Sequence, residues 1–158
     1  MNHSLYDELD EIINESGETQ SGSGPASDEL IAEYEKQLGV KFPESYITFL
    51  KRYGTMTVNG ESFYGISKLG LNATSAPDVR YVTLEARKPC DIDNNMVLIK
   101  SSGYGPMFSI DTSISGKKGE AVIVETDLSF KRSGNKVVVA RSFGDFICNE
   151  VKESLEDL

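Results

Sequence analysis

The first apolar pattern along the chain has the spacing of a helix. Residues 4–16 place apolar side chains at i, i+4, i+7 and i+8, which is one face of an amphipathic helix: Leu5, Leu9, Ile12 and Ile13. Residues 17–26 contain Ser-Gly-Ser-Gly-Pro and little to bury, so they predict a flexible connection. We therefore expect an acidic helix and a flexible link over residues 1–26, ahead of one domain over residues 27–158.

Two short helices joined as a helical hairpin are predicted next. The first covers residues 27–38, where Ser27 is a good N-cap and Gly39 is placed to end the helix. The second begins at Pro43, which suits the first helical turn, and continues to Tyr53. Each carries an apolar face at helical spacing, as expected of helices that pack on a core.

The apolar pattern changes to a β-type pattern after the helical hairpin. Residues 56–58 and 61–64 flank Asn59 and Gly60, and Asn-Gly between β-forming residues is the strongest local signal of a β-hairpin. A helix can start within residues 75–78 and run to about residue 87, but Val82, Leu84 and Ala86 also alternate like a strand, so the pattern leaves both structures open for that segment.

The remaining sequence is mostly β-forming. Glycines separate four short apolar runs, which we expect to be strands: residues 96–100, 107–110, 121–125 and 136–140. A last helix is predicted from Ser142, where Asp145 is placed to complete a capping box. Helices, then antiparallel strands, then a helix is the order of a single-domain α+β fold rather than of a doubly wound parallel sheet.

Acidic residues are concentrated at the start of the chain. The net charge is −9; residues 1–35 contribute −10, through ten acidic residues and no Lys or Arg, and residues 36–158 contribute +1. An acidic helix face is usually only a solvated surface, but it can also attract a basic partner. Because the same charge repels phosphates, direct binding of nucleic acid is not expected.

The sequence lacks the patterns of a membrane or secreted protein. There is no apolar run near 18 residues, and the first residues lack the basic start and apolar stretch of a secretory signal. We therefore expect a cytoplasmic protein with no membrane partner. Neither Cys90 nor Cys148 belongs to a CxxC pair, and the apolar helical setting of Cys148 predicts a buried free thiol.

The sequence contains no recognisable catalytic, metal or cofactor motif. Its single histidine, His3, lies close to a terminus, where structure frays. Residues 91–95 begin like a calcium loop, but Met96 and Ser102 stand where that loop requires Gly and Glu. The glycine-rich loop that ends at Pro106 lacks the Lys-Ser/Thr ending and a backbone donor that a phosphate loop needs. We therefore expect no enzyme activity, no metal and no cofactor.

The helical hairpin and several later segments resemble the SUKH superfamily. Residues 42–50, Phe-Pro-Glu-Ser-Tyr-Ile-Thr-Phe-Leu, are similar to that family's Leu-Pro-x-x-Tyr-x-x-Phe-Leu motif, with Phe42 in place of Leu. Four shorter segments resemble its later motifs in the same order: residues 64–66, 103–111, 120–122 and 142–146. The resemblance extends from about residue 27 to the end of the chain.

The resemblance implies helices packed on a strongly bent antiparallel sheet, built by shared residues. Pro43 would start a helix, Gly65 and Gly105 would permit bends, and four aromatic residues would lie in the core: Tyr46, Phe49, Phe108 and Phe143. Most bacterial members resemble immunity proteins of polymorphic toxin systems, whose toxins often end in nuclease or deaminase domains. Some eukaryotic relatives regulate cell-wall synthesis and signalling by binding proteins. The implied partner is a cognate toxin protein.

Candidate contact residues follow from chemistry, because partner contacts vary within such families. Aromatic residues in turns and at strand ends, flanked by acids, suit protein recognition. Six residues fit this description: Glu61, Tyr64, Asp91, Asp93, Tyr104 and Asp111. We expect an immunity protein. One alternative is a regulatory module with several weaker partners. Another is an enzyme or ligand-binding protein that uses a cleft in the sheet. The oligomeric state stays open.

Overall fold

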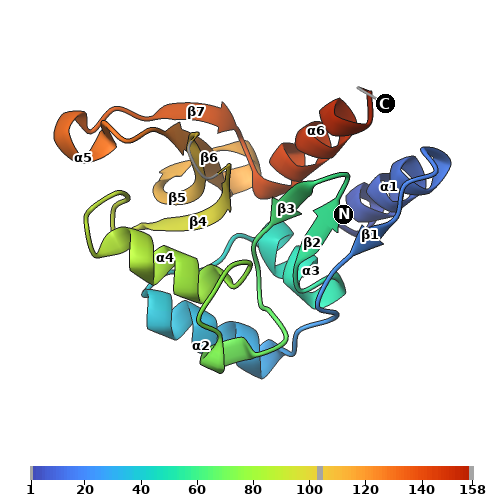
Figure 1. The fold of residues 1–158 in the computed structure, drawn as a ribbon, viewed down its shortest axis with the longest axis horizontal. Coiled ribbons are helices and arrows are strands. Elements are labelled where there is room, and N and C mark those ends of the chain that lie inside the picture. The colour runs from blue at the N-terminus through green and yellow to red at the C-terminus, as the bar shows by residue number, and fades with distance from the viewer. Residues whose placement is uncertain (1, 103–104, 157–158) are drawn as a thin grey trace.

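The computed structural model describes residues 2–102 and 105–156 (Figure 1). Its helices and strands follow in the order α1 (Asn2–Glu15), β1 (Gln20–Ser21), α2 (Asp28–Leu38), α3 (Glu44–Arg52), β2 (Met56–Val58), β3 (Glu61–Phe63), α4 (Val79–Arg87), β4 (Met96–Ser101), β5 (Met107–Ser115), β6 (Ala121–Thr126), α5 (Phe130–Ser133), β7 (Val137–Ala140) and α6 (Phe143–Glu156). Two short 3-10 turns also occur, over Gly70–Asn72 and Lys117–Gly119.

The strands form two antiparallel sheets, with the orders β1-β2-β3 and β4-β5-β6-β7. The predicted α+β class is confirmed, but the strands are divided between two sheets rather than gathered in one. The division falls after β3, where the backbone N–H of Tyr64 donates to the carbonyl of Ile99 in β4 at 2.8 Å. The two sheets therefore meet along a short line of contact at this residue.

Local sequence signals account for several element boundaries. Ser27 caps α2, since its Oγ accepts a hydrogen bond from the Leu30 N–H at 3.2 Å, and Gly39 ends the helix with φ of 71°. Asn59 and Gly60 take φ values of 48° and 80° between β2 and β3, which suits a tight hairpin turn. The segment that the sequence left open, residues 78–87, contains the helix α4.

The segment predicted to be a flexible link, residues 17–26, pairs with and packs against the rest of the fold. Gln20 and Ser21 form β1, which pairs with β2. A Cβ on Gly22 would lie 2.1 Å from the carbonyl oxygen of Thr55, so the two backbones pass in close contact there. Ser23 then donates from its Oγ to the Ile66 carbonyl at 2.6 Å. A pattern of Gly and Ser can therefore mark close backbone packing instead of flexibility.

α1 packs on the rest of the fold and covers one side of the hydrophobic core. Its side chains Tyr6, Leu9 and Ile13 are buried, and the helix lies beside α3 and α6. The Tyr6 hydroxyl donates to the carbonyl of Ser45 at 2.7 Å. Residues 1–26 and 27–158 are therefore not two separate units, because the described part of the first segment shares the core of the second.

The four-stranded sheet has apolar side chains on both faces. In β4, Val97 belongs to the larger core cluster, which includes residues of α3 and α6, whereas Met96 and Leu98 belong to a smaller cluster with Phe130 of α5. This alternation follows from the period of two of a β-strand. α5 was not predicted from the sequence, yet its phenylalanine covers the second face.

The residues shared with the SUKH motifs lie in different environments. Tyr46 and Phe49 are fully buried, and Phe143 packs against both, with ring centroids 4.8 and 5.0 Å away. A Cβ on Gly65 would come within 1.8 Å of the Gly54 carbonyl oxygen, which explains glycine at this position. Pro43 is buried at the start of α3, Phe108 is half-buried and Gly105 is exposed.

Candidate protein-binding surface

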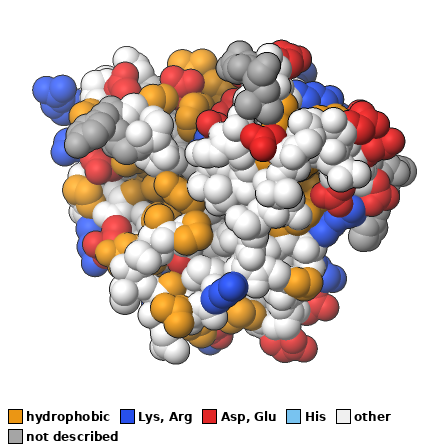
Figure 2. Space-filling model, turned by 45° about the vertical axis from the view of Figure 1, so that its right-hand side comes forward, with side chains coloured by type: hydrophobic (Ala, Val, Ile, Leu, Met, Phe, Trp, Pro, Cys, Tyr) orange, Lys and Arg blue, Asp and Glu red, His pale blue; other side chains and the backbone are white. Residues whose placement is uncertain are grey.

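α1 presents carboxylates to solvent because its apolar stripe faces inward. Glu8, Glu11 and Glu15 are exposed on its outer side, and within the described residues none of them forms an ion pair. Figure 2 shows Asp and Glu side chains gathered toward the right-hand side of the molecule, the side on which α1 lies in Figure 1. Unpaired carboxylates on one face create a negative potential that reaches into solvent.

α6 extends this acidic surface. It packs beside α1, and its exposed residues include Glu153 and Glu156 together with Lys152. We refer to the exposed sides of α1 and α6 as the acidic face. Because both helices are anchored by buried apolar stripes, the carboxylates are held on a rigid support rather than on a mobile tail.

Arg52 and Tyr53 bind two other acids of α1, the exposed Asp7 and the half-buried Asp10. Arg52 lies 2.7 Å from Asp7 and 2.7 Å from Asp10, and the Tyr53 hydroxyl donates to Asp10 at 2.6 Å. Burial lowers the pKa of Arg52, but the hydrogen bonds to the two carboxylates outweigh it and raise the pKa above its ordinary value. These two acids therefore fix α1 to α3, while the outer acids remain available.

Glu61 and Tyr64 lie together in a groove of about 380 Å³ between β3 and the end of β4. The Glu61 carboxylate is 2.6 Å from Lys100, which is also 2.6 Å from Glu150 of α6. Burial raises the pKa of the half-buried Tyr64. Because Lys100 pairs with Glu61 and Glu150 together, the Glu61 carboxylate is already bound within the fold, and the groove offers a partner the edge of Tyr64 beside a paired carboxylate.

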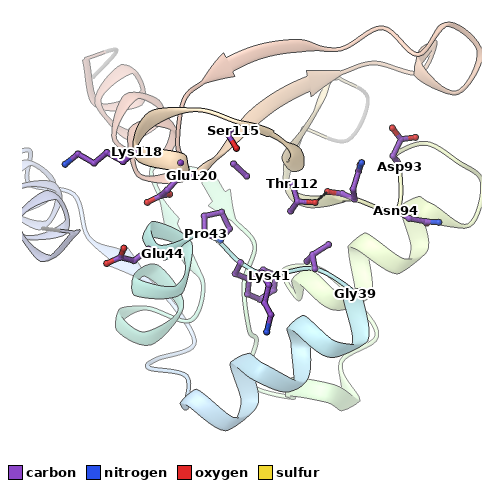
Figure 3. Close-up of a pocket in the computed structure, with 15 residues that line it drawn as sticks. Gly39, Lys41, Pro43, Glu44, Asp93, Asn94, Thr112, Ser115, Lys118 and Glu120 are labelled. Atoms are coloured by element: carbon purple, nitrogen blue, oxygen red, sulfur yellow. Dashed lines mark hydrogen bonds between the residues drawn. The ribbon is translucent and has the colours of Figure 1, made fainter.

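Asp93 lines a larger groove of about 860 Å³, between the α2–α3 link and the turns that flank β4 to β6 (Figure 3). The charged side chains around it include Lys41, Lys118 and Asp93, which point in different directions in the close-up. The groove therefore does not focus charge of one sign. Asp91 lies nearby in sequence but is half-buried, with Lys131 at 3.7 Å.

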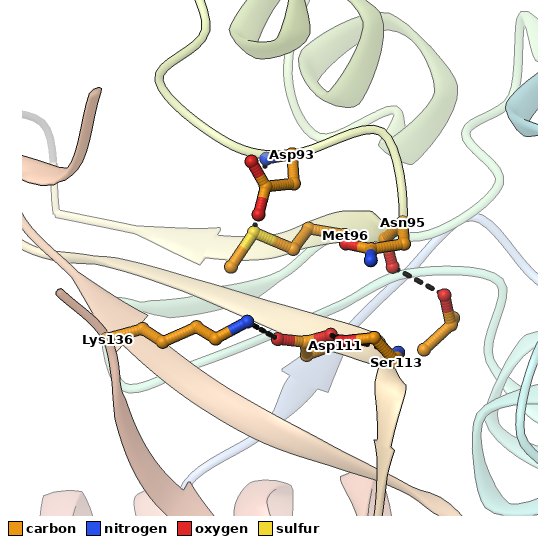
Figure 4. A network of polar contacts seen from close by, with 7 residues as sticks. Asp93, Asn95, Met96, Asp111, Ser113 and Lys136 are labelled. Atoms are coloured by element: carbon orange, nitrogen blue, oxygen red, sulfur yellow. Dashed lines mark hydrogen bonds and ion pairs between the residues drawn. The ribbon is translucent and has the colours of Figure 1, made fainter. Parts of the chain in front are cut away.

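Asp111 is fully buried and cannot serve as a surface contact. Its carboxylate is 2.7 Å from the Lys136 ammonium, and it accepts hydrogen bonds from the N–H and Oγ of Ser113 at 3.0 and 2.5 Å (Figure 4). Burial alone raises the pKa of Asp111, but these hydrogen bonds lower it below its ordinary value. Asp111 therefore belongs to the interior of the fold and not to the contact surface predicted from the sequence, because its carboxylate is bound by Lys136 and Ser113.

The six predicted contact residues do not form one surface. Glu61 and Tyr64 share a groove, and Asp93 lines a different one. Tyr104 lies outside the described residues. The sequence did point to the acidity of α1, but it could not show that α6 lies beside it.

Residues 28–147, which are more than half of the chain, match the family model SUKH_6. This family is described as SMI1-KNR4 cell-wall. The chain belongs to the SMI1-KNR4 family. The matched residues run from α2 into α6, so α1 lies outside them. The acidic face of this SMI1-KNR4 protein therefore combines one helix outside the matched region with the last helix of the domain.

Two further observations describe this SMI1-KNR4 protein. Among residues 2–102 and 105–156, no group of three or more His, Cys, Asp or Glu side chains is arranged to hold a metal ion. Over the same residues, no helix has the length and apolar character needed to cross a bilayer. Cys148 is partly buried and free, and burial raises the pKa of its thiol to about 11.

Sequence reasoning also missed an exposed apolar strand. Residues 136–140 were expected to be an apolar strand of the sheet, and β7 is formed there, but Val137, Val138 and Val139 are exposed. Only Ala140 in this strand is buried. An apolar run indicates a strand but does not reveal that the strand lies at the edge of its sheet.

Proposed function

We propose that this protein is an immunity protein, which binds a toxin protein and neutralises it without catalysis. The match of residues 28–147 to the SMI1-KNR4 family is the observation that supports this function most directly, because bacterial proteins that resemble this family are typically immunity proteins. The toxin proposed as the partner has a nuclease-type toxic domain and acts in the compartment where this protein resides, which we take to be the cytoplasm.

The acidic face suits a partner of this kind. A nuclease must bind phosphates, and protein surfaces that bind nucleic acid are rich in Lys and Arg. Glu8, Glu11 and Glu15 on α1, with Glu153 and Glu156 on α6, present carboxylates to such a surface. Opposite charges on two proteins accelerate their association, and this acceleration becomes smaller as salt is added. The acidic face would therefore act by attracting the toxin and covering its substrate-binding surface.

The test begins with capture of the partner. The tagged protein is used to isolate binding proteins from its native lysate, and the C-terminal domain of a dominant partner is then expressed alone and together with this protein. Arrested growth with the domain alone, restored by co-expression, is the expected result. Capture of a domain that does not impair growth, or impaired growth that co-expression leaves unchanged, would contradict the immunity function.

A charge-reversal pair tests the acidic face itself. Glu11→Lys with Glu15→Lys should lower the association rate constant by about tenfold at low salt, within the range known for electrostatic steering. Glu29→Lys with Glu85→Lys makes the same charge change on α2 and α4 and should alter the rate far less. Equal effects of the two pairs would show that only net charge matters, and no effect of either would remove the acidic face from the interface.

The family description favours one alternative, a regulatory module in a cell-wall pathway. Such a protein would have several partners of moderate affinity instead of one tight partner. In the same capture experiment, several proteins recovered at comparable amounts, none of which arrests growth, would favour this alternative over immunity.

A further inference from the structure

β7 leaves one edge of the four-stranded sheet open. It pairs with β6 and lies at the outer margin of the molecule (Figure 1). The opposite edge strand, β4, is covered: Leu98 donates its N–H to Thr83 Oγ1 at 3.0 Å, and the Ile99 carbonyl accepts from Tyr64. Over the residues that the structure describes, the backbone of β7 from Val137 to Val139 makes no hydrogen bond outside its ladder with β6.

The side chains of β7 are exposed in a way that is unusual for a strand. Val137, Val138 and Val139 are 63%, 49% and 39% exposed, and Leu128 in the turn after β6 is 70% exposed. Strands of a covered sheet normally bury alternate residues. Open sheet edges are usually protected by charged residues or cover, because they can pair with another chain. Three adjacent exposed valines make this edge apolar along most of its length, and its register with β6 shifts by one residue between Val138 and Ala140.

The β7 edge is positively charged at both ends in a protein whose net charge is −9. Residues 128–141 contain four basic residues and no acidic residue. Lys136 is held by Asp111 and Lys131 lies near Asp91. Arg132 in α5 and Arg141 directly after β7 are exposed, and neither forms an ion pair with another described residue.

We propose that the β7 edge binds an extended segment of another protein as an added strand. The free backbone groups of β7 would pair with that strand, and the valines would cover its alternate apolar side chains, as in other cases of strand addition. The two arginines identify the partner further: the bound segment carries acidic residues on both sides of its apolar core. This surface is distinct from the acidic face, which attracts a partner of the opposite charge.

A second copy of this chain fits the β7 edge less well. Antiparallel pairing of two β7 strands would bring the exposed Arg141 of each copy toward the start of the other copy's β7, next to α5 with its exposed Arg132. Like charges opposite one another across a strand pair are destabilising. An acidic segment removes this repulsion and gains an attraction instead, so charge favours a different protein as the occupant.

Peptide titration followed by NMR tests the proposal with the full chain. The probe is a synthetic peptide with an alternating Val-Thr core and two Glu at each end, and the comparison peptide carries Lys in place of Glu. The expected result is that amide signals of residues 137–139 shift, and that the Glu peptide binds at least about fivefold more tightly at low salt, as an interaction between opposite charges requires. The Glu peptide with N-methylated core residues should not bind, because it cannot form the ladder.

Two matched variants separate the charge effect from unspecific binding. Arg132→Glu with Arg141→Glu should abolish the preference for the Glu peptide, and both residues are exposed, so the fold should be retained. Lys41→Glu with Lys118→Glu, exposed residues of the 860 Å³ groove, should leave the preference unchanged. Shifts confined to other strands, equal binding of the N-methylated peptide, or concentration-dependent shifts of residues 137–139 without peptide would each overturn the proposal, the last in favour of a second copy.

Discussion

Replacement of Lys136 by Met would leave the carboxylate of Asp111 inside the protein without its cation. Asp111 is fully buried, and the Lys136 ammonium lies 2.7 Å from it. Removal of one partner of a buried ion pair costs about 3–5 kcal/mol. The Lys136 side chain is 26% exposed, and Ser113 would still donate two hydrogen bonds. We therefore expect a loss of about 2–3 kcal/mol, below the full cost of breaking such a pair.

The same substitution should change how stability depends on pH. The pKa of Asp111 in the folded protein lies below its ordinary value, so its contribution to stability is present above an unfolded-state pKa of about 3.9 and is lost as pH falls. Without Lys136 the pKa of Asp111 rises and this contribution disappears. The difference between the two proteins should therefore be largest near neutral pH and should shrink below about pH 4, where the carboxylate of the unfolded chain is protonated.

Urea unfolding at pH 7 and at pH 3.5 measures both effects. Asp111→Asn in the Lys136→Met background should restore part of the lost stability, because it removes the uncompensated charge. Lys131→Met is the control, since the exposed Lys131 is 3.7 Å from the half-buried Asp91, and a solvent-accessible pair at this distance contributes about 0–1 kcal/mol. A Lys136→Met protein as stable as the wild type at pH 7 would refute the reasoning. A confirmed loss would also mean that the folding of an Asp111 variant has to be measured before any binding defect is assigned to a lost contact.

Three further predictions concern packing and chemistry. Leu9→Ala should destabilise the protein by about 2–4 kcal/mol in urea unfolding, because this α1 side chain is fully buried; a change below 1 kcal/mol would mean that α1 is loosely docked. Gly65→Ala should prevent folding or lower the melting temperature by more than 10 °C in calorimetry, since its Cβ would meet the Gly54 carbonyl at 1.8 Å. Cys90 is exposed and Cys148 has a thiol pKa raised to about 11, so a maleimide at pH 7.5 should label Cys90 first, and equal rates would contradict that burial.

Local signals in the sequence predicted most of the elements correctly. Asn59 and Gly60 identified the first hairpin, because few other residue pairs adopt two successive positive φ values. Ser27 and Gly39 marked both ends of α2, since each satisfies backbone groups at a helix end. Such signals act over a few residues, so they can be recognised in the sequence without knowledge of the tertiary fold.

Features that depend on distant segments could not be predicted in the same way. Asp111 was expected at the surface, but Lys136 and Ser113 bind its carboxylate inside the fold. Lys136 reaches Asp111 only because the chain reverses direction through α5 in the folded protein. β1 contains two residues, too few for any periodic pattern. The acidic face required knowledge that α1 lies beside α6, two elements at opposite ends of the described chain.

The packing of α1 against α6 also has a consequence for protein synthesis. A ribosome releases the residues of α1 long before those of α6, so the buried side of the first helix has no complete partner while most of the chain is still being translated. α3 can cover part of this side earlier, but only polypeptides synthesised at least as far as α6 can complete the burial of the apolar side of α1. The acidic face would then be assembled late, and truncated nascent chains would neither fold fully nor offer that surface to a partner.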